Sequence, residues 1–105
     1  MVAVGRPQHA SFDAAKAALL QLTRYLACEL DPRRIRVNSI SPGPFPAPAI
    51  GKADPAFIQR LGTRTALGRI GEPPELVGPV VFLLSDASSF VTGVNLSVDG
   101  GWTSW

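Results

Sequence analysis

Few side chains in this 105-residue sequence can act as nucleophiles or metal ligands. Cys28 is the single cysteine and His9 the single histidine, which excludes an intrachain disulfide and a zinc site built from soft ligands. His9 has no serine or aspartate companion in a recognisable motif. Cys28 lies deep in a predicted helix, where we expect a small buried hydrophobe. Neither residue predicts a catalytic centre.

Two other features could serve a ligand: Lys16, within a predicted helix, and the turn Pro42-Gly43, after a predicted strand. Taken alone, Lys16 is an ordinary solvated helix lysine and Pro42-Gly43 is a stiff surface turn. Their functional interpretation therefore depends on the elements that position them.

The strongest predicted helix runs from Ser11 to Leu30, a stretch without glycine or proline. Ser11 is the expected N-cap, and the helix dipole favours Asp13 in the first turn. Apolar residues occupy two faces of this helix, which is typical of burial on two sides. We expect a sheet against one side and a partner against the other.

The rest of the chain alternates helices with strands, and the prolines of 42–48 predict a stiff extended loop. The expected elements are a strand at 35–40, a helix at 56–64 capped by Asp54, a turn at 68–71, a helix from 72 to about 85 that Pro79 weakens or kinks, and a strand at 94–98. This order predicts an α/β fold with a parallel sheet. Two parallel strands lack the neighbours and cover that such sheets need, so we expect residues 1–105 to form one unit, without internal boundary, of a larger fold.

The composition, 46% hydrophobic and 17% charged, is that of a soluble globular segment. The net charge is only +2 and the basic residues are scattered, which argues against nucleic-acid binding. The longest apolar runs, such as Val80 to Leu84, are far too short to span a bilayer, and no cationic-then-apolar leader opens the chain. We therefore expect no membrane partner and a cytoplasmic setting.

Four segments, in this order, closely resemble the C-terminal part of a short-chain dehydrogenase/reductase: Phe12-Asp13-Ala14-Ala15-Lys16, Arg36-Val37-Asn38-Ser39-Ile40-Ser41-Pro42-Gly43, Gly68-Arg69-Ile70-Gly71-Glu72-Pro73, and Thr92-Gly93 with Val98-Asp99-Gly100-Gly101. The resemblance covers essentially the whole chain. It implies the C-terminal part of a Rossmann-like doubly wound parallel sheet, incomplete without its N-terminal half. It also implies an oxidoreductase that uses NAD or NADP and acts on a small alcohol or ketone.

Several family features have no counterpart here. The glycine-rich phosphate-binding turn, the ribose selector and the catalytic Asn and Ser lie upstream in the family pattern, and no G-x-x-x-G-x-G stretch occurs in this chain. The resemblance therefore leaves NAD and NADP as alternatives and puts pyrophosphate binding outside this chain.

The family's catalytic pair is a Tyr and a Lys four residues apart on one helix. Phe12 stands at the Tyr position, whereas Lys16, which in the family lowers the phenol pKa and binds the nicotinamide ribose, is retained. Phenylalanine has no exchangeable proton, and loss of a positioned general acid costs ~10²–10⁴ in rate. We expect negligible turnover by this chain alone.

Pro42-Gly43 resembles the family's nicotinamide-side turn, where glycine permits a close pass. The stretch after it, which contains Phe45, lacks the Thr that often bonds the carboxamide. Residues 46–67 then correspond to the substrate-covering loop and small helices. Their apolar side chains could line a pocket or simply pack, as applies to Phe57, Ile58 and Leu61.

A second hypothesis belongs to another class: a non-catalytic interaction or oligomerisation module derived from this family. The helices at 11–30 and 76–84 and the last strand are elements with which family members build dimers and tetramers. Trp102 and Trp105 suggest either a partner surface or local packing. The expected partner is a second copy or a complementing chain of the same family.

Overall fold

The computed structural model describes residues 10–104, with the side chains of Ala10 and Phe12 outside the description. Contacts divide the chain into two compact units. The first unit comprises the described part of 1–39 together with 89–95, and the second comprises 40–88 and the described part of 96–105. The expectation of a single unit remains a prediction, because contact clusters alone do not define domains.

Helix α1 (Ala10–Glu29) dominates the first unit, and the predicted long helix is confirmed. The helix begins at Ala10, so Ser11 lies in its first turn and its predicted role as N-cap is wrong. Among the described side chains of α1, Thr23 and Ala27 are buried. Ala27 lies against Gly93, where an added Cβ would stand 3.4 Å from the alanine methyl. The expected burial on two sides is therefore not seen, and Leu19 stays half exposed.

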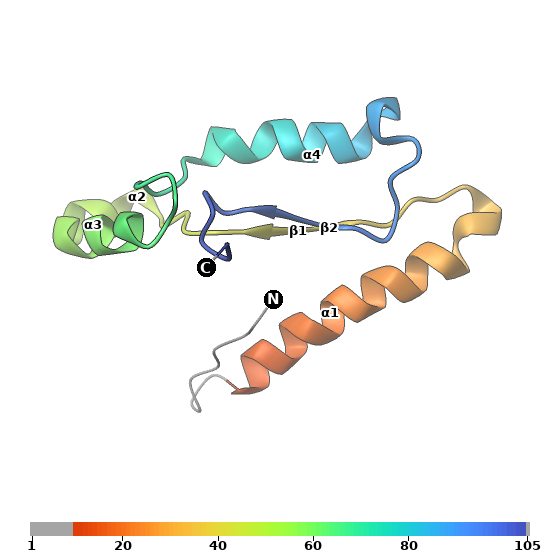
Figure 1. The fold of residues 1–105 in the computed structure, drawn as a ribbon, viewed down its shortest axis with the longest axis horizontal. Helices are drawn as coiled ribbons and strands as arrows, with labels where there is room; N and C mark the ends of the chain where they lie inside the picture. Colours follow the sequence, from red (N-terminus) through yellow and green to blue (C-terminus); the bar gives the residue numbers. More distant parts are fainter. Residues whose placement is uncertain (1–9, 105) are drawn as a thin grey trace. The chain divides into compact units, whose positions relative to one another are not determined.

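Strands β1 (Ser39–Pro42) and β2 (Asn95–Val98) form a two-stranded sheet and run in the same direction (Figure 1). The predicted α/β class with parallel pairing is confirmed. The predicted second strand matches β2, whereas the predicted first strand, at 35–40, begins four residues before β1 and ends two residues before its end. The backbone before Ser39 is held mainly by side chains: the Asn38 amide donates to the Val91 carbonyl and accepts from the Val94 N–H.

The second unit contains short helices: α2 (Pro48–Ala53), α3 (Pro55–Thr63) and α4 (Val77–Leu84), the last entered through a 3₁₀ turn at Pro73–Leu76. Asp54 caps α3 as predicted, accepting from the Phe57 N–H at 3.0 Å. Helix α2 was missed because Pro48 was assigned to the loop, although proline suits the first helical turn. Pro79 lies in the first turn of α4, where the backbone N–H groups have no partner within the helix, so proline costs little there.

The hydrophobic core of the described residues is thin. Ala27 and Leu83 are its buried apolar members, and the buried polar side chains are Thr23, Thr65 and Ser88. No helix in the described part of the chain is long and apolar enough to cross a membrane. Large apolar side chains remain exposed in both units, including Leu84 at 81%.

Candidate functional site

Lys16 and Phe12 both lie on α1, about one helical turn apart. Lys16 is exposed and belongs to the first unit, whereas Pro42, Gly43 and Phe45 belong to the second. The two groups are therefore described separately.

The turn that begins at Pro42 ends strand β1. The Gly43 N–H donates to the Val98 carbonyl at 2.9 Å, which continues the sheet pairing. A Cβ on Gly43 would stand 2.6 Å from the Asp99 Cα, a backbone atom that cannot give way. Glycine is thus required by the backbone of the neighbouring strand, a reason that the sequence did not reveal.

The next two residues of the turn contact Gly71. The Gly71 N–H donates to the Pro44 carbonyl at 2.9 Å. A Cβ on Gly71 would stand 2.4 Å from Cε1 of Phe45, so the phenyl ring lies directly over this glycine. Segment 70–72 therefore contacts the turn Pro42–Phe45 through a backbone hydrogen bond to Pro44 and through packing against the Phe45 ring.

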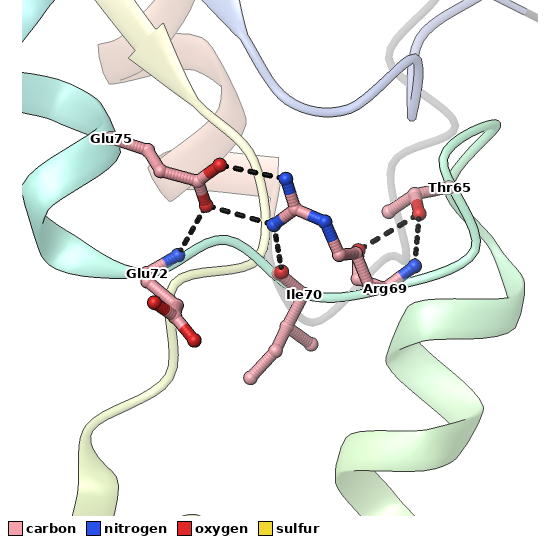
Figure 2. Close-up of polar contacts among 5 residues, drawn as sticks. All are labelled: Thr65, Arg69, Ile70, Glu72 and Glu75. Carbon is pink, nitrogen blue, oxygen red and sulfur yellow. Dashed lines mark hydrogen bonds and ion pairs between the residues drawn. The ribbon is translucent and has the colours of Figure 1, made fainter.

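Arg69 organises that segment, as Figure 2 shows. Its guanidinium makes a two-pronged ion pair with the Glu75 carboxylate, at 2.8 and 2.7 Å, and also donates to the Ile70 carbonyl at 3.1 Å. Glu75 in turn accepts from the Glu72 N–H at 2.8 Å. We call these contacts of Arg69, Ile70, Glu72 and Glu75 the clasp.

Thr65 holds the backbone of Arg69 at the other end of the clasp. Its buried hydroxyl accepts from the Arg69 N–H at 3.1 Å and lies within donating distance of two carbonyls, those of Arg69 (2.9 Å) and Gly62 (3.0 Å). The sequence predicts a turn at 68–71 and a helix that begins at Glu72, but no contact between them. The available signal was Glu72 followed three residues later by Glu75, the spacing of a capping box.

Hydrogen bonds and ion pairs in the second unit shift the pKa values of three side chains, each in the direction that favours its charged form. The Arg69 guanidinium, with the Glu72 N–H, lowers the pKa of Glu75 to about 2, and the ion pair raises the pKa of Arg69. The Thr103 hydroxyl, with backbone N–H groups of Gly101 and Thr103, lowers the pKa of Asp99. These carboxylates are ionised near neutral pH and are held by the chain's own donors.

A small pocket of about 180 Å³ adjoins the turn. Apolar side chains and the backbone of the β2 end form most of its wall: Pro44, Phe45, Leu67, Arg69, Ile70, Gly71, Glu75, Val98, Asp99 and Gly100. The candidate pocket residues of α3 are not among them. Ile58 instead lies against Gly51 of α2, which supports the packing interpretation.

The remaining sequence candidates have separate outcomes. Cys28 is exposed, so the prediction of a buried thiol is wrong. The Arg64 guanidinium covers the Trp102 ring at 4.7 Å, which supports local packing of this indole. His9 and Trp105 lie outside the described residues.

Each unit holds one feature that suits part of a dinucleotide. In the first unit, Lys16 is an exposed residue of α1 whose side chain carries donors of the kind that bind a ribose. In the second unit, a glycine-containing turn follows a parallel strand, and such a turn suits the close approach of a flat ring. Between residues 10 and 104, no strand leads through a glycine-rich turn into a helix, which is the usual pyrophosphate cradle. Nor do three His, Cys, Asp or Glu side chains gather there as a metal site.

Comparison with known proteins gives consistent matches. The family described as enoyl-(acyl carrier protein) reductase matches residues 1–103. The galactitol 2-dehydrogenase (L-tagatose-forming) of Cereibacter sphaeroides is 44% identical over 97% of this chain and 41% of its own length. The inactive 2-(S)-hydroxypropyl-CoM dehydrogenase 2 of Xanthobacter autotrophicus is 39% identical over 95% of this chain and 46% of its own length.

Solved structures give the same kind of match. The structure of 4-hydroxyisoleucine dehydrogenase complexed with NADH superposes with a TM-score of 0.82 at 36% identity, over 91% of this chain and 40% of that one. This chain thus spans less than half the length of these relatives, and its α/β fold corresponds to part of theirs.

Proposed function

Because the chain belongs to the short-chain dehydrogenase/reductase family, we propose that it is the C-terminal section of an oxidoreductase that uses NAD or NADP and acts on a small alcohol or ketone. The observation that carries this proposal is the match of residues 1–103, together with a structural relative that binds NADH. Alone, the chain is inactive in this proposal, since it spans 41% of a relative such as galactitol 2-dehydrogenase.

The proposed roles follow from the position of each residue. Lys16 donates hydrogen bonds to the nicotinamide ribose, because its ammonium is exposed on α1 and carries three donors. Pro42, Gly43 and Phe45 form the turn beside the nicotinamide, which supplies or accepts the hydride when the cofactor is bound. The small pocket beside this turn, lined mostly by apolar surface, adjoins the proposed position of the nicotinamide.

Phe12 is the proposed reason for lost catalysis. The residue at this position must pass a proton to or from the substrate oxygen, and a phenyl ring has none to exchange. Lys16, one turn along α1, would lower the pKa of a phenol there through its positive charge. We therefore propose that Lys16 retains its ribose role while the proton transfer is missing.

A chimera tests the proposal. The part of the Cereibacter galactitol 2-dehydrogenase outside its matched segment is joined to this chain, with Phe12 unchanged or replaced in a Phe12→Tyr variant. Galactitol oxidation and L-tagatose reduction are followed by NADH absorbance. We expect Phe12→Tyr to raise the rate by ~10²–10⁴.

Phe90→Tyr is the matched control, because it adds the same hydroxyl at a fully exposed ring. Its rate should equal that of the unsubstituted chimera. NADH binding, measured by fluorescence, should be similar in all three proteins. An equal rate in the Phe12→Tyr chimera and its parent would contradict the role assigned to position 12.

The second candidate function is a non-catalytic interaction module. Exposed apolar surface favours it, and one relative that matches this chain is itself named inactive. Among the described side chains, the exposed large apolar ones are Leu19, Leu22, Tyr25, Ile35, Phe90 and Val94 in the first unit, and Ile50, Phe57, Leu67, Val77, Val80, Val81, Phe82 and Leu84 in the second. The partner in this proposal is a second copy or a complementing chain of the family.

A thermal melt of the 105-residue chain alone, followed by far-UV circular dichroism, separates the two candidates. A sharp transition whose midpoint rises with protein concentration supports the module, because self-association then covers the apolar surface. A broad, weak transition supports the enzyme section, because two strands with so few buried apolar side chains need the rest of the fold.

A further inference from the structure

The clasp acts on one peptide group, the one that joins Ile70 to Gly71. Its carbonyl accepts from the Arg69 guanidinium at 3.1 Å, and its N–H donates to the Pro44 carbonyl at 2.9 Å. Because a peptide group is planar and trans, fixing the direction of its C=O also fixes the direction of its N–H. A cation on the carbonyl also polarises the group and strengthens the bond from its N–H.

The following peptide group is held by the same ion pair. The Glu72 N–H donates to Glu75, whose carboxylate is locked by the two prongs of Arg69. Gly71 is thus fixed on both sides, with the Phe45 ring packed directly over it. Figure 2 shows the Arg69 guanidinium with its bonds to the Glu75 carboxylate and to the Ile70 carbonyl.

We propose that Arg69 is a positioning residue for the turn Pro42–Phe45: through the Ile70–Gly71 peptide it holds Pro44 and Phe45 in the conformation that receives the nicotinamide end of the cofactor. This inference rests on the proposed function. Arg69 lies in the second unit with the turn, and its guanidinium bonds to the Glu75 carboxylate and the Ile70 carbonyl. In this proposal it acts through the backbone that it holds.

Arginine is needed for this arrangement because three directed contacts start from one rigid planar group. Lysine can keep the charge pairing with Glu75 but lacks the fork that reaches a carboxylate and a carbonyl together. If Arg69 only stabilised the fold, its positive charge beside Glu75 would be enough. To position the turn, it must also donate a hydrogen bond to the Ile70 carbonyl. Lysine therefore separates the two roles.

The test compares Arg69→Met and Arg69→Lys in the chimera, with Arg33→Met as the matched control, since Arg33 is an exposed arginine of the first unit. We expect the NADH dissociation constant to rise about three- to tenfold in Arg69→Met and by an intermediate factor in Arg69→Lys. We expect the Arg69→Lys melting temperature to remain close to that of the parent. Arg33→Met should leave the dissociation constant unchanged.

Amide hydrogen exchange at Gly71 provides the second measurement, in the chimera and in the 105-residue chain. We expect faster exchange in Arg69→Met than in Arg33→Met. Equal exchange overturns the link to Pro44, and faster exchange with unchanged NADH affinity overturns the positioning role. If the parent chimera binds no NADH, the proposed function is contradicted, and with it the proposed effect of Arg69 on cofactor binding. Hydrogen exchange at Gly71 still tests the effect of Arg69 on the Ile70–Gly71 peptide in that case.

Discussion

Helix α1 and segment 62–75 are both rich in hydrogen bonds, but they are held in opposite ways. The helix has 20 residues, of whose described side chains Thr23 and Ala27 are buried, so its order comes mainly from local backbone bonds. Segment 62–75 is mostly irregular, yet Gly62 and Thr65 are buried and polar side chains fix its backbone. A helix of this kind gains most of its stability from a partner surface, whereas the irregular segment carries its own supports.

The largest expected effect comes from the close backbone contact at the end of β1. Gly43→Ala places a Cβ 2.6 Å from the Asp99 Cα, so the strand ends must separate and the bond from Gly43 to Val98 weakens. We expect a loss of about 3 kcal/mol in the free energy of unfolding, measured by urea denaturation of the chimera. Gly51→Ala is the control, because its nearest neighbour would be at an ordinary 3.6 Å. Equal stability of the two variants would contradict the close contact.

A smaller loss is expected when the support of segment 62–75 is removed. Thr65→Val keeps the shape of the side chain but leaves the Arg69 N–H without its acceptor in a buried setting. The expected cost is about 1–3 kcal/mol by the same measurement. The exposed Thr63, which donates to the Arg60 carbonyl, gives the matched Thr63→Val control with an expected change under about 0.5 kcal/mol. If Thr63→Val lowers the free energy of unfolding as much as Thr65→Val does, burial of the Thr65 hydroxyl does not explain the loss.

Helix α4 offers the reverse change, a gain. Apart from its chain neighbours and the helix's own backbone, Gly78 has nothing within 4 Å of an added Cβ, and it lies in the first turn of α4, directly before Pro79. Gly78→Ala should raise the free energy of unfolding by less than about 0.5 kcal/mol, because alanine loses less backbone entropy than glycine, while a Cβ directly before Pro79 offsets part of that gain. If Gly78→Ala lowers the free energy of unfolding in the chimera but raises it in the 105-residue chain, the part of the chimera that comes from galactitol 2-dehydrogenase covers this face of α4.

The smallest effect on stability is expected from the exposed clasp. The pKa of Glu75 is lowered to about 2 by Arg69, so the folded chain holds Glu75 ionised where the unfolded chain protonates it. This contribution is complete above the ordinary glutamate pKa and is lost as the pH falls from about 4.5 towards 2. Melting temperatures across that range should fall less in Glu75→Gln than in the parent. Parallel curves would show that the ion pair is absent in solution.

The same contrast explains how far sequence reasoning reached. Helix α1, the Asp54 cap and strand β2 were predictable, because periodicity and capping chemistry are local signals. The start of β1 was not, because Asn38 bonds to residues more than fifty positions away. Cys28 was assigned to the interior from its place in an apolar helix, but this chain covers little of that helix.

The candidate site divides in the same way. Lys16, Phe12 and the turn at Pro42 were identified by family resemblance, and their roles stay predictions. The clasp of Arg69 and Glu75 was missed, since it combines an ion pair between two side chains with bonds from each side chain to the backbone of an irregular turn. Such contacts leave no periodic pattern in the sequence.

The parallel sheet has a consequence for synthesis of the chain. Val37, just before β1, bonds to Thr92, 55 residues later, so the first strand leaves the ribosome well before its neighbour exists. At a translation rate of ~5–20 residues per second, this wait lasts roughly 3–11 seconds. During that interval the edge of β1 is open to any other extended strand, and the prolines that follow it limit how far such mispairing can spread.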